Sequence, residues 1–153
     1  MSVFSKPISG FRFWKLTGDA NTDPAIKSVG LGDKIWTSLN HADCGIGYDH
    51  KAPDQNCACG LYAYHKANIS QRLSSLRVLN HPLVYGAVLG KGSVQVAVSG
   101  WRSEEAQIIA FLRYPGTMEP EYEKSEYQDI LEKLSKKHGV ALVDSIEELE
   151  NLA

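Results

Sequence analysis

The chain has 153 residues, of which 43% are hydrophobic and 22% charged, and its formal net charge is −2 at pH 7. These values predict a single domain spanning residues 1–153 with an ordinary hydrophobic core. They exclude the global basic surface that drives non-specific nucleic-acid binding, although a local basic patch stays open. No apolar run approaches the ~18 residues of a membrane span, so no membrane contact is predicted. The odd cysteine count and the lack of an N-terminal apolar signal predict a reducing, cytoplasmic location.

The first third of the chain predicts short strands separated by irregular segments. Residues 10–16 alternate in character, with Phe11 on one face and Arg12 on the other, which is typical of a strand. Residues 18–24 have the glycine, asparagine, aspartate and proline content of a loop. Residues 25–40 lack a clean period and predict a short strand or an irregular cover.

All three cysteines and one histidine then fall within sixteen residues, as Cys44, His50, Cys57 and Cys59. Thiolate and imidazole are ligands that zinc prefers, and four of them fill its tetrahedron without leaving a position for catalytic water. Glycines and prolines interrupt this segment, so burial in a core would not order it. The pattern therefore predicts a structural zinc ion that staples an irregular loop.

Two other histidines compete for the imidazole position. His41 and His65 lie close to the cysteines in sequence, but His50 lies between them in the most turn-rich stretch and is preferred. The spacing of Cys57 and Cys59 is tighter than the usual two-residue gap of zinc sites. The alternative is that the thiols are free and the histidine unrelated. A disulfide between Cys57 and Cys59 is disfavoured because one intervening residue strains its geometry.

A cysteine-dependent enzyme, with Cys44 or Cys57 as its nucleophile, is the catalytic alternative. Cys44 with His41 or His50, oriented by Asp43 or Asp49, supplies the residue types of a Cys–His nucleophile. The partners in such sites usually converge from distant segments rather than from sequence neighbours. We therefore assign no catalytic residue and do not predict an enzyme.

The middle of the chain predicts a helix followed by strands. Residues 67–79 carry apolar side chains at helical spacing. Residues 84–89 and 93–98 are rich in β-branched side chains and predict two strands, joined by a tight turn at residues 90–92. Residues 104–112 allow helix or strand, and their β-branched and aromatic content favours a strand.

The C-terminal third predicts two further helices around a short strand. A helix is expected from about residue 120 to His138, with Gly139 as its left-handed cap, followed by a strand over residues 140–143. Ser145, three residues before a glutamate, predicts a capping box that opens a last helix. Together the elements predict an α+β fold, with a small, mostly antiparallel sheet, helices packed on one face or end, and a zinc-stapled loop.

Tryptophan and arginine occur together twice, as Arg12 with Trp14 in the first predicted strand and as Trp101 with Arg102 just before Glu104. Aromatic walls with an arginine and a carboxylate can hold a planar or cationic ligand by stacking and by polar contacts. These five residues predict a binding module for a nucleotide, a base or a protein partner. The alternatives are core tryptophans with arginines packed on them, or a scaffold or inhibitor that acts through its surface.

Residues 50–63 contain the pattern His-x-Ala-Pro-x3-Cys-x-Cys-Gly-Leu-Tyr-Ala. Residues 10–14 read Gly-Phe-Arg-Phe-Trp, and residues 100–106 read Gly-Trp-Arg-Ser-Glu-Glu-Ala. This combination resembles a pattern in small uncharacterised proteins of actinobacteria and their phages. The resemblance covers about residues 10–112 and implies that the cysteine cluster and the Trp–Arg segments belong to one module. It supplies no substrate, and the ligand and the oligomeric state are left open.

Overall fold

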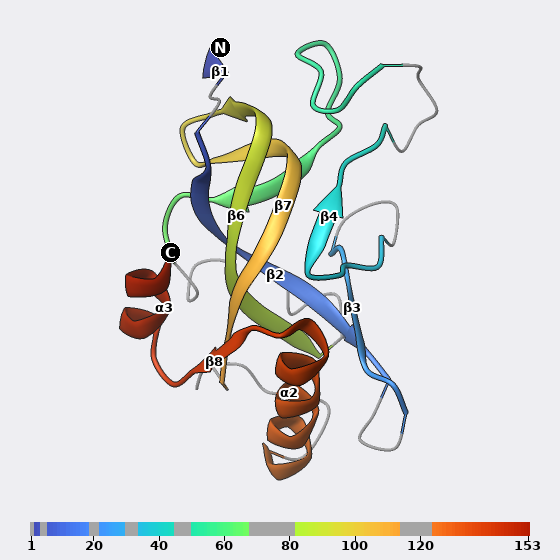
Figure 1. Cartoon of the computed structure of the whole chain (residues 1–153), viewed down its shortest axis with the longest axis vertical. Helices are drawn as coiled ribbons and strands as arrows, with labels where there is room; N and C mark the ends of the chain where they lie inside the picture. The colour runs from blue at the N-terminus through green and yellow to red at the C-terminus, as the bar shows by residue number, and fades with distance from the viewer. Residues whose placement is uncertain are drawn as a thin grey trace.

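The computed structural model of the chain describes residues 2–3, 6–18, 22–29, 34–44, 50–67, 82–113 and 124–153. Within these ranges an eight-stranded sheet and two helices are present (Figure 1). The strands are β1 (Ser2–Val3), β2 (Ile8–Thr17), β3 (Ala25–Lys27), β4 (Leu39–His41), β5 (Leu61–Tyr64), β6 (Leu83–Val96), β7 (Gly100–Leu112) and β8 (Ala141–Val143), and the helices are α2 (Lys124–His138) and α3 (Ile146–Leu152). Neither helix in this part of the chain is long and apolar enough to cross a membrane. The helix predicted over residues 67–79 falls almost entirely outside the described residues.

Four of the strands close into a ring. β6 and β7 form a long antiparallel hairpin, and β2 pairs with β6 along the edge that β7 does not use. β5 pairs with β7 and reaches β2 through the single pair Phe11–Tyr64. Each strand of the set β2–β6–β7–β5 therefore has a partner on both sides. The sheet curls into a small barrel where these four strands meet. Figure 1 shows β2 and β5 crossing the β6–β7 hairpin.

The antiparallel prediction holds for every pair of strands in the described residues except one, because β8 runs parallel to β7. β4 pairs with β7 beyond β5, on the same edge. Both helices pack against β7 and β8 at one end of the sheet, away from β1 (Figure 1). This arrangement confirms the predicted α+β class with helices at one end.

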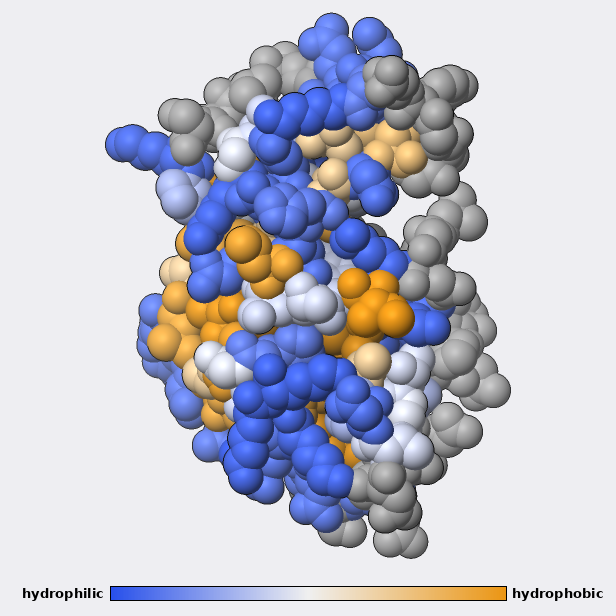
Figure 2. Space-filling model, turned by 45° about the vertical axis from the view of Figure 1, so that its right-hand side comes forward, coloured by the Kyte–Doolittle hydropathy of each residue, from blue (hydrophilic) through white to orange (hydrophobic). Residues whose placement is uncertain are grey.

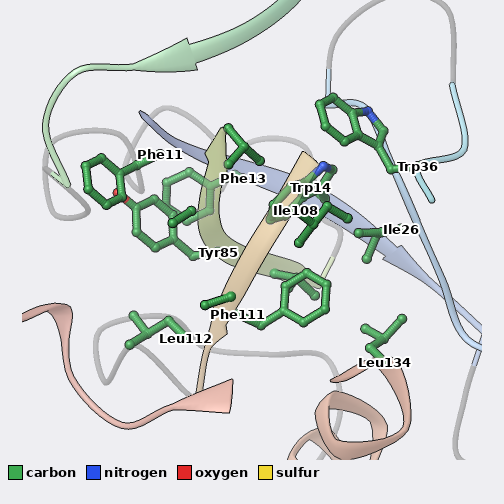
Figure 3. Close-up of a cluster of buried hydrophobic side chains, with 14 of the residues drawn as sticks. Phe11, Phe13, Trp14, Ile26, Trp36, Tyr85, Ile108, Phe111, Leu112 and Leu134 are labelled. Carbon is green, nitrogen blue, oxygen red and sulfur yellow. The ribbon is translucent and has the colours of Figure 1, made fainter. Parts of the chain in front are cut away.

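Both faces of β2 are buried, which gives the core two aromatic layers (Figure 3). On one face Phe13 packs against Tyr85, with ring centroids 4.4 Å apart. On the other face Trp14 meets Trp36 and Phe111 edge-on, each at 5.6 Å. Tilted and edge-to-face pairs such as these are favourable beyond the area that they bury. β2 therefore lies in the centre of the core.

Helix α2 buries the side chains whose helical spacing predicts it. Tyr127, Ile130, Leu131 and Leu134 all have exposed fractions of 0%. The Tyr127 hydroxyl also donates a hydrogen bond to the carbonyl oxygen of Leu83, at the start of β6. On the face shown in Figure 2, hydrophobic surface occurs in separate patches divided by hydrophilic side chains.

The remaining elements of the C-terminal half confirm the predictions. β7 includes residues 104–112 as strand. α2 ends at His138, and Gly139 adopts a left-handed φ of 66°. Ser145 caps α3, because its hydroxyl accepts a hydrogen bond of 3.1 Å from the N–H of Glu148. These ends are set by local chemistry, which explains why the sequence locates them.

The turn predicted at residues 90–92 is wrong, because β6 continues through them. The β6–β7 register shifts between Lys91 and Val94, where two residues of β6 face only Glu104 on β7. This is a β-bulge, and Gly92 occupies it with a φ of 74°. A glycine in such a segment can indicate either a bulge within one strand or a turn between two strands. The two cases differ in whether the strand continues through the glycine, which depends on its pairing partners.

The indole of Trp101 lies across the inside of the ring of strands. A Cβ on Gly10 of β2 would lie 2.8 Å from its Nε1 atom, and a Cβ on Gly90 of β6 would lie 2.6 Å from its six-membered ring. Its Nε1 donates a 2.9 Å hydrogen bond to the carbonyl oxygen of Ser9. Glycine is needed at both positions because the indole occupies the space of a side chain.

We expect Gly90→Ala to lower the free energy of unfolding by about 1–3 kcal/mol, because the added methyl group overlaps the Trp101 ring. The same change in a Trp101→Leu background should cost much less, since the ring is gone. Urea denaturation of the four proteins of this double-mutant cycle measures the difference. An equal loss in both backgrounds would mean that the ring does not set the requirement for glycine.

His138 is buried at the end of α2, where its ring lies edge-on to Phe111 at 5.8 Å. Burial lowers the pKa of His138, and the nearby charge of Lys137 lowers it further, while Asp23 opposes the shift. The folded protein therefore binds this proton less readily than the unfolded chain, in which histidine titrates near pH ~6.5.

The contribution of His138 to stability should accordingly be complete above pH ~6.5 and should fall as the pH drops through this value. Urea denaturation of the metal-free protein at several pH values between about 7.5 and about 5.5 measures the loss. His138→Gln should reduce the slope in this window. His41→Gln, at an exposed position, serves as the control, and equal slopes for both variants would contradict the assignment.

Candidate metal centre

The four predicted ligands come from two segments that are both attached to β7. Cys44 follows β4, and the pairing with β7 extends toward it because the N–H of Ala42 donates a 2.7 Å hydrogen bond to the carbonyl oxygen of Glu104. The other three ligands lie in residues 50–60, which we call the cysteine loop and which leads directly into β5. β4 and β5 lie along the same edge of β7, so the sheet delivers both segments to one place.

The ligand atoms of the four residues gather within 4.8 Å of one another. The Sγ atoms of Cys44 and Cys57 are 3.7 Å apart, and Nε2 of His50 lies 3.3 Å from Sγ of Cys59. A tetrahedron with Zn–S bonds of about 2.3 Å and a Zn–N bond of about 2.0 Å has edges of about 3.8 Å between sulfurs and about 3.5 Å between sulfur and nitrogen. The cluster is close enough to hold a metal ion.

The structure groups His50, and not the two competing histidines, with the cysteines. Nδ1 of His41 lies 3.3 Å from a carboxylate oxygen of Glu105, its partner across the β4–β7 pair. Nε2 of His65 lies 2.9 Å from the carbonyl oxygen of Ala97. The preference for the histidine between the cysteines therefore agrees with the geometry.

The three cysteines form no disulfide bond with one another. Burial raises the pKa of the Cys59 thiol, and the neighbouring thiols of Cys57 and Cys44 raise it further, while a backbone hydrogen bond at Asp54 opposes the shift. The Cys59 thiol thus resists ionisation in the absence of a cation. A bound metal ion reverses this preference, since it stabilises each thiolate directly.

Asp54 closes a short turn in the cysteine loop. Its side-chain Oδ1 accepts a 2.8 Å hydrogen bond from the N–H of Asn56, and its carbonyl oxygen accepts one of 3.1 Å from the N–H of Cys57. An aspartate that binds the backbone two residues ahead is a common way to close a short turn. The turn brings the chain back toward His50 before the last two ligands.

Arg102 on β7 holds the backbone of this loop. Its Nη1 donates to the carbonyl oxygen of Cys59 at 2.6 Å and also to that of Cys57. Its Nη2 donates to the carbonyl oxygen of Asp54 at 2.9 Å and to the side-chain oxygen of Gln95 at 2.5 Å. The planar guanidinium can satisfy several acceptors at fixed angles, which a lysine cannot do. The carbonyl groups of two ligand residues are thus fixed by one side chain.

Two further contacts hold the same loop against the barrel. The Tyr62 hydroxyl donates a hydrogen bond to the carbonyl oxygen of Ala58. Glu104 forms a 3.0 Å ion pair with Lys51, and its other carboxylate oxygen accepts a 3.2 Å hydrogen bond from the N–H of Ser93 in the bulge. The hydrogen bonds from Lys51 and Ser93 lower the pKa of the Glu104 carboxyl group.

Gly60 joins the cysteine loop to β5 with a φ of 132°. A Cβ at this position would lie 3.0 Å from the Cβ of Arg102 and 3.2 Å from that of Pro53. The conformation and the close approach both favour glycine. The loop therefore lies directly on the Arg102 side chain as it enters the sheet.

The five residues predicted to bind a ligand face different surroundings in the protein. Trp14 is buried in the aromatic core, and Trp101 is buried inside the ring of strands. Arg102 and Glu104 contact the cysteine loop. Arg12 reaches across from β2, as described next, so each of the five has contacts within the protein. A ligand at these residues stays a prediction.

Arg12 links β2 to β5 where their backbone pairing is sparse. Its Nη1 donates a 3.0 Å hydrogen bond to the carbonyl oxygen of Tyr62. Its guanidinium carbon lies 4.1 Å from the centre of the Trp36 ring and 5.5 Å from that of Trp14, which are cation–π distances. Burial lowers the pKa of Arg12 to about 9, so the group stays charged at neutral pH.

The catalytic alternative stays a prediction, because the ligand atoms of Cys44 and His50 lie within 4.8 Å of each other as members of the cluster. His50 contacts Cys59, and the sulfur beside Cys44 is that of Cys57. His41 faces Glu105 instead of Cys44. Asp49 lies outside the described ranges.

Sequence reasoning missed the residues that support the cluster, namely Asp54, Tyr62 and Gln95. The Asp-x-Asn order after a proline was a usable turn signal for Asp54. Tyr62 and Gln95 carried none, because their partners come from another segment of the chain.

Comparison with protein-family models, with curated proteins and with solved structures finds no match for this chain. The geometry of the fold and of the cluster therefore carries the functional conclusion.

We expect Arg102→Lys to loosen the cysteine loop, because an ammonium group cannot bond all the carbonyl oxygens that the guanidinium holds. The free energy of unfolding of the metal-free protein should fall by about 1–3 kcal/mol, and the loop amides should exchange faster with solvent. Arg113→Lys is the matched control, since Arg113 pairs with Asp144 and Glu132 at the surface. It should change stability by less than about 0.5 kcal/mol. Equal effects would remove the special role of Arg102.

Proposed function

We propose that Cys44, His50, Cys57 and Cys59 bind one zinc ion in a closed tetrahedral centre. The observation that carries this proposal is the convergence of three thiols and one imidazole nitrogen within 4.8 Å. The measured S···S and N···S separations are near the edges of a zinc tetrahedron. Thiolate-rich sets of this kind favour zinc over the hard cations, which prefer oxygen ligands.

The centre is structural in this proposal, because four protein ligands leave no coordination position for water or substrate. Three of the ligands lie on the cysteine loop, and only Cys44 comes from outside it. The zinc ion would therefore tie the segment after β4 to the loop before β5. Three thiolates and a neutral imidazole give the zinc site a net charge of −1, which the guanidinium of Arg102, bonded to the carbonyl groups of two ligand residues, offsets.

The protein as a whole is proposed to be a zinc-stabilised binding module and not an enzyme. A filled ligand shell supports this choice over Cys–His catalysis, since a histidine that is bound to zinc cannot act as the general base for a cysteine nucleophile. Recognition of a nucleotide, a base or a protein partner through the Trp–Arg residues is supported by the sequence pattern. The contacts of Arg102 and Glu104 with the cysteine loop support a role in holding the metal site.

Elemental analysis and native mass spectrometry of the full chain, purified without chelators, test the centre directly. We expect one zinc ion per chain and three thiols that resist alkylation until a chelator is added. Cobalt substitution should give the intense visible absorption of a tetrahedral thiolate site. Cys57→Ser should lower the metal content, whereas His41→Asn should leave it unchanged.

Protein that carries no metal, and whose three thiols react at once, would overturn the proposal. Retention of full zinc affinity by both His50→Asn and Cys57→Ser would also overturn it, because the ion would then be held elsewhere.

A further inference from the structure

One pair of sulfurs in the cluster joins two segments of the chain. Cys44 follows β4, Cys57 lies in the cysteine loop, and their Sγ atoms are 3.7 Å apart. A disulfide bond requires about 2.05 Å between sulfurs, so the two atoms would approach by about 1.7 Å. Rotation of two cysteine side chains covers such a distance. Cys59 is the less suitable partner for Cys57, because only one residue separates them.

The backbone near both cysteines is held by β7 without help from a metal ion. Ala42 lies two residues before Cys44, and its N–H donates a hydrogen bond to the carbonyl oxygen of Glu104. Arg102 bonds to the carbonyl oxygen of Cys57. Loss of the metal ion would leave these contacts in place, and the two sulfurs would stay near each other.

The sulfur of Cys57 is also within reach of a small oxidant. Cys57 and Cys59 are partly exposed, whereas Cys44 is the most buried member of the cluster. The neighbouring side chains of the loop are exposed to solvent, namely Lys51, Gln55, Asn56 and Ala58.

We infer that Cys44 and Cys57 form a redox-sensitive pair, which a hydroperoxide converts to a disulfide with release of the metal ion. This inference rests on the proposed zinc centre. Oxidation would exchange a metal link between the β4 segment and the cysteine loop for a covalent one. The protein would thus report oxidant by releasing zinc while this connection of its fold is kept.

The reaction balances with the hydroperoxide as the only oxidant. One thiolate attacks a peroxide oxygen, the O–O bond breaks, and a sulfenic acid forms at that sulfur. The second thiolate attacks the same sulfur, the S–S bond forms, and hydroxide leaves. The two sulfurs lose two electrons, and with two protons from solvent hydrogen peroxide becomes two water molecules. Zinc is left with His50 and Cys59, and it dissociates because two of its four ligands are gone.

The test uses the full-length wild-type chain, so it does not depend on a variant that might not fold. Zinc content is first measured by native mass spectrometry, and hydrogen peroxide is then added in the presence of a chromogenic zinc chelator. We expect release of one zinc ion per chain, loss of two of the three thiols and a peptide cross-link between Cys44 and Cys57. A dithiol reductant with added zinc should restore all three thiols and the bound ion.

Three results would overturn the inference while leaving the zinc centre intact. These are zinc retention at peroxide levels that oxidise free cysteine, release with a Cys57–Cys59 link, and release through sulfinic or sulfonic acids without any disulfide. Protein that contains no zinc but still forms the Cys44–Cys57 disulfide would overturn the proposed metal centre and the metal release, and only the sulfur pairing would survive.

Discussion

The bonds from Arg102 to the backbone of the cysteine loop are the interaction on which the candidate site depends. The loop has few buried apolar side chains, so the hydrophobic effect does little to fix its path. The guanidinium of Arg102 fixes the path of the loop instead, because it donates hydrogen bonds to the carbonyl groups of Asp54, Cys57 and Cys59. Because these carbonyls belong to the turn and to two ligand residues, the sulfur positions follow from the position of a single side chain on β7.

The alternation of β7 explains how one short segment serves the core and the site together. Successive side chains of a strand point to opposite faces. Trp101 and Ser103 are buried, with exposed fractions of 2% and 0%, whereas Arg102 and Glu104 contact the cysteine loop on the other face. Within the four residues Trp-Arg-Ser-Glu, two side chains thus point into the core and two hold the cysteine loop. A shift of one residue would exchange the two sets.

Arg12 of β2 also links two segments through its guanidinium, at the place where β2 and β5 close the ring of strands. β2 and β5 share a single backbone pair, and Arg12 adds a hydrogen bond to Tyr62 across the gap. Trp101 of β7 donates another hydrogen bond across the inside of the ring to Ser9 of β2. Side chains therefore replace part of the missing strand ladder, and both Trp–Arg segments serve to close the barrel or to hold the loop. Their pairing in the sequence reflects this shared architecture.

The sequence by itself determined the elements whose signals are local: the alternation of the first strand, the spacing of Tyr127, Ile130, Leu131 and Leu134 in α2, the caps at Gly139 and Ser145, and the choice of Cys44, His50, Cys57 and Cys59 as a cluster. These depend on neighbouring residues or on ligand chemistry, so they can be read along the chain. Only the tertiary structure decided that residues 90–92 form a bulge and that the ring of strands closes. It also decided that Arg102 and Glu104 face the cysteine loop, because these outcomes depend on which distant segments pair with β7 and on the space that Trp101 occupies between them.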